Sequence, residues 1–267
     1  MNHAFALCVV TYRPEEHLKD RLLMAIEQGY SVYVFDNTPG GCNWMHLAGL
    51  KSAKWLGNGE NVGLGKGLNQ LLLTVQGDGF RGAFYVDQDT DFKENTLSWI
   101  DHFLDMHPEA LFHWGALNFL YSGAFRECIE RVHLMVSAGT LFNLGAMSVI
   151  GGHNTHWFLE CVDYEWCGRA LKAGYPLGVV RGCCGLDHER YQPISTVRWM
   201  GELRRYRLYP VRRSIQFVWG LFRLGNWGMV HGLREYAGAC YRNMFTHLLD
   251  QLRAMVFSVL KWGRLIS

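Results

Sequence analysis

The chain has 267 residues, of which 49% are hydrophobic and 19% charged, a balance that excludes an intrinsically disordered protein. No apolar run approaches the ~18–20 residues that cross a bilayer, and the apolar residues 5–10 follow no basic segment, so we expect neither a membrane span nor a signal peptide. The eight scattered cysteines contain no Cys-x-x-Cys pair, which disfavours zinc and favours free thiols in a reducing cytoplasm.

The formal net charge of +2 conceals two oppositely charged parts. Residues 198–267 hold 12 Lys and Arg against 3 Asp and Glu, a net charge of +9, whereas residues 1–197 hold 14 against 21, a net charge of −7. We therefore expect two domains with these boundaries, an acidic body and a basic tail. The tail is suited to an anionic partner.

Apolar strand patterns alternate with helical patterns along the body. Strands are expected at residues 5–10, 32–35, 52–57 and 83–86, and helices at 15–29, 44–50, 66–76 and 92–107. This alternation predicts βαβ units and a mostly parallel sheet. Beyond them we expect strands at 110–119 and 177–180, a β-rich stretch around 137–142, and a helix at 160–173.

Three carboxylates, Asp87, Asp89 and Asp91, follow the strand at 83–86. In an open α/β sheet, ligands bind beyond the carboxyl ends of the strands. Clustered carboxylates repel one another unless a cation lies among them, and Mg²⁺ or Mn²⁺ prefers oxygen ligands and often bridges to substrate phosphates. The pattern predicts a metal–diphosphate site, with a solvated polar turn as the alternative.

Polar residues follow other strands of the predicted sheet. The strand-end residues expected to line a nucleotide pocket are Thr11, Tyr12, Arg13, Asp36, Asn37 and Gln88. A parallel sheet places such strand ends at one edge. The glycines of residues 61–65 precede a helix and would let the backbone approach a diphosphate or sugar closely. This loop matches neither a P-loop nor a dinucleotide fingerprint.

Taken in order, these motifs resemble family 2 glycosyltransferases of the GT-A fold, over about residues 5–190. The matching segments are residues 9–14, 34–37, 61–65 with Asn69, and 86–89. The Asp-Gln-Asp form and the segments 137–140, 151–152 and 157–169 resemble the bacterial rhamnosyltransferase-like branch. The resemblance implies a GT-A domain, followed here by a basic amphipathic helical extension.

The resemblance also implies roles for individual residues. In such enzymes the Asp-x-Asp motif holds a divalent ion on the donor diphosphate, so Asp89 would bind the metal and Asp87 the donor sugar or ribose. His188 corresponds to a histidine that often completes the metal site, although a lone histidine is also common at surfaces and in cores. The nucleoside pocket and the loop near the donor would comprise Thr11, Tyr12, Asp36, Asn37, Asn61, Gly63, Gly65 and Asn69.

Inverting sugar transfer needs a carboxylate that takes the proton from the acceptor hydroxyl. The segment from Asp163 resembles the acidic pair and arginine of the family, although Val162 stands where the commoner form has a glutamate. We expect Asp163 to be the base. Glu165 and Glu160 are the alternatives for the base or for orienting the acceptor, because Glu160 and Asp163 would share a helix face.

Structural interpretations compete with catalysis in this segment. Acids at the start of a helix favour the helix dipole. Arg169 lies four residues after Glu165, where it can form a purely structural ion pair. Trp157 and Phe158 would either stack on an acceptor sugar or belong to the core.

The basic tail interleaves arginines with aromatic residues and then shows apolar residues at helical spacing over residues 244–260. A basic amphipathic helix with aromatic residues can lie on an anionic membrane surface. Equally, its apolar stripe can pack on the main domain or on a second subunit of a homodimer. Nucleic acid is disfavoured, because no binding motif occurs and the body is acidic.

The sequence therefore predicts an inverting glycosyltransferase that depends on Mn²⁺ or Mg²⁺. It would move rhamnose from dTDP-rhamnose onto a lipid-linked polysaccharide acceptor, such as an O-antigen precursor, from the cytoplasmic face of the plasma membrane. A UDP-sugar donor such as UDP-galactose or UDP-galactofuranose is an alternative. A nucleotidyltransferase is disfavoured, because it would need a basic glycine-rich loop after the first strand, which residues 11–14 do not form. A non-catalytic sugar-binding protein is disfavoured by the intact carboxylates at 87, 89 and 163.

Overall fold

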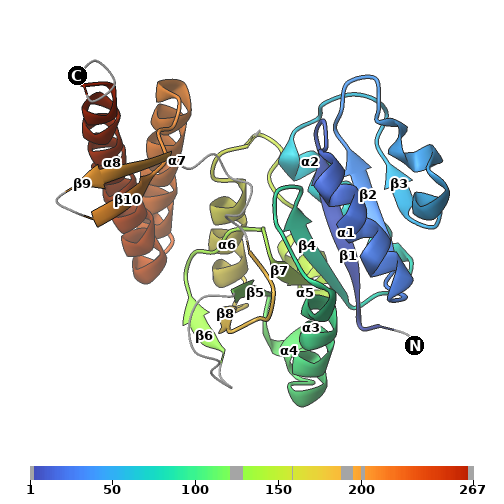
Figure 1. The fold of residues 1–267 in the computed structure, drawn as a ribbon. Helices are drawn as coiled ribbons and strands as arrows, with labels where there is room; N and C mark the ends of the chain where they lie inside the picture. Colours follow the sequence, from blue (N-terminus) through green and yellow to red (C-terminus); the bar gives the residue numbers. More distant parts are fainter. Residues whose placement is uncertain (1–2, 121–128, 158, 188–194, 200–201, 264–267) are drawn as a thin grey trace. The chain divides into compact units, whose positions relative to one another are not determined.

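The computed structural model describes residues 3–120, 129–157, 159–187, 195–199 and 202–263 (Figure 1). The chain forms two compact units, residues 1–191 and 192–267. In the part of the chain that the structure describes, every helix is too short or too polar to cross a membrane.

The first unit is built on an eight-stranded sheet in the order β3-β2-β1-β4-β7-β5-β8-β6. The strands are β1 (Phe5–Thr11), β2 (Val32–Asp36), β3 (Lys54–Leu56), β4 (Gly82–Asp87), β5 (Ala116–Leu120), β6 (Glu130–Val132), β7 (Thr140–Asn143) and β8 (Leu177–Arg181). The four strands from β3 to β4 are parallel, and so are β5 and β8. β7 runs antiparallel to both β4 and β5, and β6 antiparallel to β8. This sheet confirms the expected α/β class.

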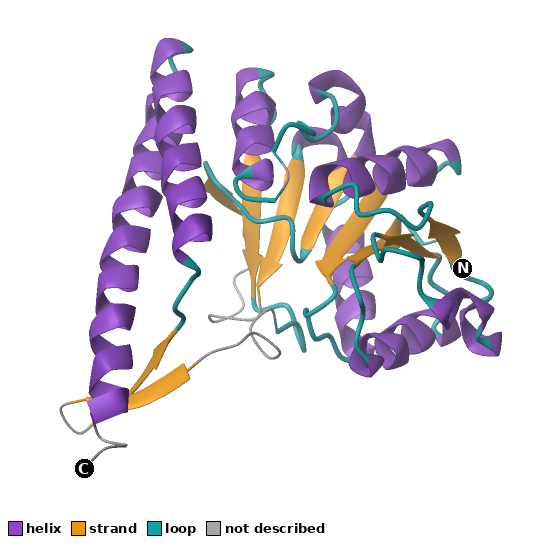
Figure 2. Ribbon diagram, turned by 90° about the horizontal axis from the view of Figure 1, so that it is seen from above, coloured by secondary structure: helices purple, strands orange, loops and turns teal. Residues whose placement is uncertain are grey.

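Helices cover both faces of the sheet (Figure 2). They are α1 (Glu16–Glu27), α2 (Leu64–Gly77), α3 (Glu94–Met106), α4 (Ala110–His113), α5 (Leu144–Ile150) and α6 (Val162–Lys172), with 3₁₀ turns at Asn43–His46 and Ala48–Leu50. Because both faces are covered, β1 is buried along its whole length, which explains its continuous apolar run. Edge-to-face contacts of Phe119 with Phe84 and Phe103, at 6.0 and 5.5 Å between ring centroids, join the sheet to α3.

Two sequence predictions in this unit were wrong. The apolar residues 110–119 are not one strand but α4 followed by β5, because periodicity alone does not separate a short buried helix from a strand. The single helix expected at 44–50 is two 3₁₀ turns. The β-rich stretch at 137–142 contributes only β7 from Thr140, and α5 follows it directly.

The second unit begins with a hairpin that the sequence analysis missed. β9 (Ser195–Trp199) pairs antiparallel with β10 (Glu202–Tyr206), so two strands that the sequence analysis did not predict follow β8. The expected helical extension starts only at α7 (Val211–Val230) and continues as α8 (Arg234–Gly263). Alternating β-branched, leucine and aromatic residues favour the strands, but the arginines among them masked this pattern.

One buried histidine, His153, lies in the loop before α6. Its ring packs edge-on against Phe142 at 5.5 Å and stacks on Trp166 at 5.7 Å. It is 3% exposed, and neither ring nitrogen finds a hydrogen-bond partner among the described residues. Burial, with the positive charge of Arg169 adding to it, lowers the pKa of His153 to about 3. The imidazole is therefore neutral in the folded protein.

This burial predicts a pH-dependent loss of stability. Below the ordinary pKa of about 6.5, the His153 imidazole binds a proton in the unfolded chain but not in the folded chain. The free energy of unfolding therefore falls as the pH drops from about 6.5 towards 3, by up to about 1.4 kcal/mol per pH unit. His153→Phe keeps the aromatic packing and removes this proton site. Its stability relative to wild type should rise as the pH is lowered, as measured by urea unfolding at pH 7.5, 6 and 5.

The matched control is His46→Phe, at an exposed position of the same unit. It controls, at each pH, for the loss of one imidazole and the gain of one phenyl ring. A pH-independent offset for His153→Phe would contradict the assignment of a neutral buried imidazole.

Candidate active site

Carboxylates from two distant segments meet at the carboxyl end of β4. Burial raises the pKa of Asp87 to about 7; a hydrogen bond from Tyr85 opposes this shift, and the negative charges of Asp89 and Asp163 add to it. Asp87 is the last residue of β4 and Asp89 lies two residues beyond it, whereas Asp163 lies in the first turn of α6. Because such repulsion acts over short distances in a partly buried site, the structure brings these acids into one electrostatic cluster.

Two hydroxyl groups hold the carboxylates in place. Tyr85 Oη donates a hydrogen bond of 2.8 Å to Asp87 Oδ1, and Ser137 Oγ donates one of 2.6 Å to Asp163 Oδ1. Tyr85 is opposite Thr140 in the β4–β7 pairing. Since β7 runs antiparallel, the residues just before Thr140 continue past Tyr85 towards Asp87, which brings Ser137 to the site.

Neither hydroxyl was predicted as a site residue. The available signal for Tyr85 was its position two residues before Asp87, on the same face of the strand. Ser137 lies in a segment quoted for its family resemblance, but a role for it requires the antiparallel register. Burial raises the pKa of Asp163; the hydrogen bond from Ser137 opposes this effect, and the charge of Glu160 adds to it.

The alternatives to Asp163 as base are placed differently. Glu165 forms a two-pronged ion pair with Arg169, at 2.8 Å to Nε and 3.0 Å to Nη2, which confirms the expected pair. Arg169 also donates to the carbonyls of Ile150 at 2.9 Å and Gly152 at 2.6 Å. Arg169, oriented by Glu165, therefore anchors α6 to the loop after α5.

The argument that Glu160 shares a helix face with Asp163 is wrong. The helix begins only at Val162, and Cys161 before it has a left-handed backbone with φ of 61°. Glu160 thus lies in the preceding loop. Its charge nevertheless acts on Asp163, so it is near the cluster. Asp163 stays the predicted base, because its carboxylate bonds to the neutral hydroxyl of Ser137, whereas Glu165 is paired with the cation of Arg169.

At the end of β2, Asp36 and Asn37 build loops with their side chains. Asp36 is 8% exposed and accepts hydrogen bonds from the backbone of Thr38 at 2.9 Å and of Cys42 at 2.6 Å. The Asn37 amide accepts from Val62 N at 3.0 Å and donates to the carbonyl of Gly63 at 3.2 Å. These bonds join the end of β2 to the glycine-rich loop.

The glycine-rich loop lies against the start of α6. Gly63 has a φ of 85°, which favours glycine, and its N–H donates to Asn61 Oδ1 at 3.1 Å. A Cβ on Gly65 would lie 3.4 Å from Val162 Cγ1. Asn69 holds the loop before α6 by accepting from His153 N at 2.6 Å and donating to its carbonyl at 2.8 Å. The contacts of Asn61, Gly63, Gly65 and Asn69 with a donor stay predictions.

The ends of β1 and β4 are joined by Gln88. Its amide accepts from Tyr12 N at 2.7 Å and donates to the Tyr12 carbonyl at 3.2 Å. Thr11 is fully buried, with its hydroxyl 3.3 Å from Asp36 Oδ1. Tyr12 is 41% exposed, with the Arg13 guanidinium 5.4 Å from its ring centroid. Tyr12 thus presents an exposed aromatic surface at this edge of the sheet.

The loop after Asp89 is fixed by a buried ion pair. Arg21 on α1 donates to Asp91 Oδ1 at 3.1 Å and to the Gln88 carbonyl at 3.1 Å. Asp91, the third carboxylate after the strand, is a buried partner of this arginine and not a solvated acid of a polar turn. Its backbone also exchanges two 2.8 Å hydrogen bonds with Asp187. His188 lies outside the described residues, but the residue before it lies against the acidic loop.

The clustered carboxylates fit a hard divalent cation. They supply oxygen ligands of the kind that Mg²⁺ and Mn²⁺ prefer, and their mutual repulsion at Asp87 is what a bound cation would relieve. Within the residues that the structure describes, no three His, Cys, Asp or Glu side chains already form a metal-binding group.

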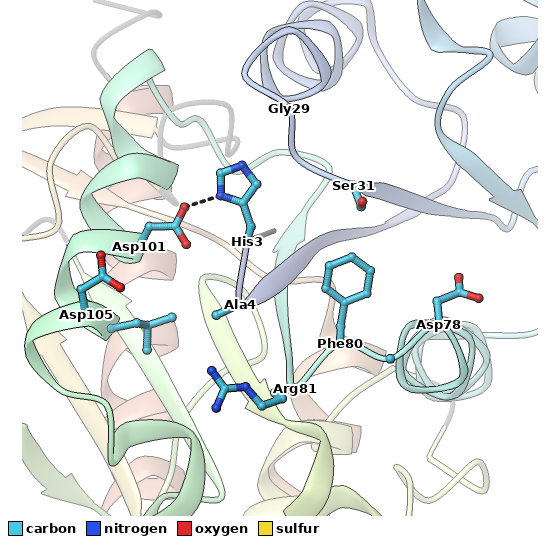
Figure 3. A pocket seen from close by; sticks show the side chains of 11 residues that line it. His3, Ala4, Gly29, Ser31, Asp78, Phe80, Arg81, Asp101 and Asp105 are labelled. Carbon is cyan, nitrogen blue, oxygen red and sulfur yellow. Dashed lines mark hydrogen bonds and ion pairs between the residues drawn. The ribbon is translucent and has the colours of Figure 1, made fainter. Parts of the chain in front are cut away.

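A cavity of about 650 Å³ lies at the opposite, amino-terminal edge of the sheet (Figure 3). There Asp101 accepts hydrogen bonds from Tyr30 Oη at 2.5 Å and pairs with His3 Nδ1 at 2.7 Å. The ring of His3 stacks on Tyr30 at 3.9 Å. These contacts fix the start of the chain on α3, and none of the predicted site residues lines this cavity.

Comparisons with known proteins agree with this architecture. No family model matches the chain. It is 22% identical over 199 residues to the dTDP-rhamnosyl transferase RfbF of Shigella flexneri, a match that covers 67% of each chain.

The fold is similar to that of S. aureus TarS. For TarS the TM-score is 0.53 at 16% identity over 68% of this chain, and the match spans 36% of TarS. For TarS 1–349 in complex with UDP-GlcNAc the TM-score is 0.55 at 14% identity, over 91% of this chain and 72% of that one. The first unit therefore has the expected GT-A fold.

The ion pair between Arg21 and Asp91 predicts a large stability effect. Their side chains are 6% and 12% exposed, so Arg21→Leu would leave Asp91 buried without its cation. Removing one partner of a buried pair costs about 3–5 kcal/mol, measurable as a fall in the free energy of unfolding in urea. Arg21→Leu with Asp91→Leu should recover part of this loss.

A matched control on α1 is Lys19→Ala, which removes the exposed pair with Glu16 and should cost much less stability than Arg21→Leu, because exposed ion pairs contribute little. Equal losses for Arg21→Leu and Lys19→Ala would show that the buried pair does not hold the acidic loop.

Proposed function

We propose that this chain is an inverting, metal-dependent glycosyltransferase that takes a hexose from a nucleotide sugar. The observation that carries the proposal is the convergence of Asp87, Asp89 and Asp163 at the carboxyl edge of the sheet, with Tyr85 and Ser137 holding two of them. The similarity to RfbF and the fold shared with TarS support it.

In this proposal Asp163 is the general base. An acceptor hydroxyl attacks the anomeric carbon from the face opposite the nucleotide; Asp163 takes its proton, the new glycosidic bond forms, and the bond to the diphosphate breaks with inversion. A base works best when its pKa lies near the working pH. Burial raises the pKa of Asp163 in that direction. The bond from Ser137 fixes one carboxylate oxygen and so orients the other.

Asp89 and His188 are proposed to hold the divalent ion. When bound, such an ion stabilises the negative charge of the departing diphosphate. Asp87 would contact the donor sugar or ribose, because Tyr85 fixes its carboxylate at the strand end. Exposed Tyr12 would stack on the nucleoside base, while Asp36 and Asn37 shape the loops around it.

Two donors are each supported by one comparison. RfbF, named as a dTDP-rhamnosyl transferase, favours dTDP-rhamnose. TarS, crystallised with UDP and with UDP-GlcNAc, favours a UDP-sugar. The acceptor in this proposal is a lipid-linked saccharide at the cytoplasmic face of the plasma membrane.

Donor binding tests the metal role. Isothermal titration of dTDP-rhamnose and UDP-sugars with Mn²⁺ should reveal one class that binds, and Asp89→Ala should weaken that binding by more than tenfold, because the diphosphate loses its bridging cation. The control is Asp105→Ala, an exposed acid at the opposite edge of the sheet. Full Mn²⁺-dependent binding by Asp89→Ala would exclude Asp89 as ligand.

The base is tested by turnover without an acceptor, since water can replace the attacking hydroxyl. Asp163→Asn should lower the rate of nucleoside diphosphate release by about 10²–10⁴-fold and leave donor binding unchanged. Glu165→Gln breaks the pair with Arg169 and should mainly lower thermal stability. If Asp163→Asn keeps its rate while Glu160→Gln loses it, the base is Glu160.

A further inference from the structure

The second unit carries an open apolar groove along its two helices. The groove has a volume of about 610 Å³. Its lining includes Val211, Ile215 and Trp219 on α7 and Leu248, Leu252 and Met255 on α8. These positions recur every three or four residues, so each helix contributes one continuous stripe.

The helices close tightly at one end and leave the groove open at the other. Near the turn between them, a Cβ on Gly225 would lie 2.5 Å from the Tyr241 ring, and one on Gly228 would lie 2.7 Å from Tyr236. Towards the other end, Val211 is 74%, Ile215 63% and Leu252 56% exposed. Removing large apolar side chains from water is favourable, so these stripes favour an apolar environment.

Arginines are positioned at the end of this groove. The guanidinium groups of Arg207 and Arg213 lie 4.7 and 5.4 Å from the centroid of Tyr209, which lines the groove. Gln251 fixes this arrangement by accepting from Tyr209 N at 2.9 Å and donating to the Arg207 carbonyl at 3.2 Å. Arg253, exposed on α8 after Leu252, instead pairs with Asp250 at 3.5 Å. The Tyr209 end of the apolar groove is thus cationic.

We propose that the groove and its arginines form a docking surface for a bilayer that contains anionic phospholipids. The apolar stripes would enter the boundary of the acyl chains, and the guanidinium groups would bind lipid phosphates. Lys and Arg side chains near such a surface strengthen the binding electrostatically. The groove is almost wholly apolar in its lining and the chain from residue 198 has a net charge of +9, a combination that matches an anionic amphiphilic surface.

A second copy of the chain is a poorer occupant. It would bring a second tail of the same +9 charge against the arginines, and like charges repel across a contact. An anionic bilayer instead neutralises them. The proposal does not rest on the sugar-transfer chemistry, because it uses only residues of the second unit.

Vesicle flotation of the full chain tests the surface. Wild type should float with vesicles of phosphatidylglycerol and phosphatidylcholine, and at least tenfold less with phosphatidylcholine alone. Ile215→Glu with Leu252→Glu should lower the floating fraction at least tenfold, because two charges would enter the acyl boundary. Arg207→Glu with Arg213→Glu should do the same by removing the phosphate contacts.

Matched controls come from the first unit. Leu73→Glu changes a leucine that is 67% exposed on α2, and Lys51→Glu changes an exposed lysine; both should float as wild type does. Circular dichroism and donor titration check that each variant is folded, so a lost donor site is distinguished from a lost docking surface.

Three outcomes would overturn the proposal. One is flotation of the groove variants equal to that of wild type, and another is equal wild-type flotation on neutral and anionic vesicles. The third is a wild-type dimer in light scattering that the groove variants convert to monomer without any loss of flotation, which would assign the groove to a second copy.

Discussion

The antiparallel pairing of β7 with β4 is the constraint on which the candidate site depends. In a purely parallel sheet, the start of every strand lies at the edge away from the ligand. Because β7 is reversed, with Thr140 opposite Tyr85, the turn before it reaches the edge where β4 ends. Ser137 in that turn then contacts Asp163 on α6. One reversed strand thus links the acidic end of β4 to a helix that follows much later in the sequence.

The hydrogen bonds around each acid separate structural carboxylates from available ones. Asp36 receives backbone N–H groups and shapes a turn, Asp91 is neutralised by Arg21, and Glu165 by Arg169. Asp87 and Asp163 receive neutral hydroxyl groups instead, and their pKa values are raised. A raised pKa means that the folded chain stabilises the negative charge incompletely. A bound cation, or a proton taken from an acceptor, would complete the stabilisation of these carboxylates.

The sequence was most informative where one physical rule acted alone. The strands β1, β2 and β4 are buried on both faces and read as continuous apolar runs, so their ends and the acids there were predictable. The interpretation of an apolar run as a strand failed at residues 110–119, where helix and strand patterns coincide. The helical spacing of Glu160 and Asp163 was also misleading, because Cys161, with its left-handed backbone, delays the start of α6.

Other features depend on contacts that no local pattern encodes. Ser137 reaches the site only through the register of β7 with β4, and the predicted donor ligand Gln88 also bonds to the Tyr12 backbone, a contact that no local pattern indicates. Asp91 looked equivalent to Asp89 by spacing, yet Arg21 from a different helix decides its role. Sequence reasoning identified which strand ends matter, and tertiary contacts determined which side chains there are engaged.

The charge asymmetry has a consequence for any approach to an anionic surface. Such a surface attracts the +9 tail and repels the −7 body, so the chain as a whole, with a net charge of only +2, would gain little from long-range attraction. Both effects fade beyond a screening length of about 8 Å at physiological salt. Binding energy must then come from short-range contacts, in which arginines and apolar side chains act together. The second unit places both on one surface, because Tyr209 holds Arg207 and Arg213 beside the stripes of α7 and α8.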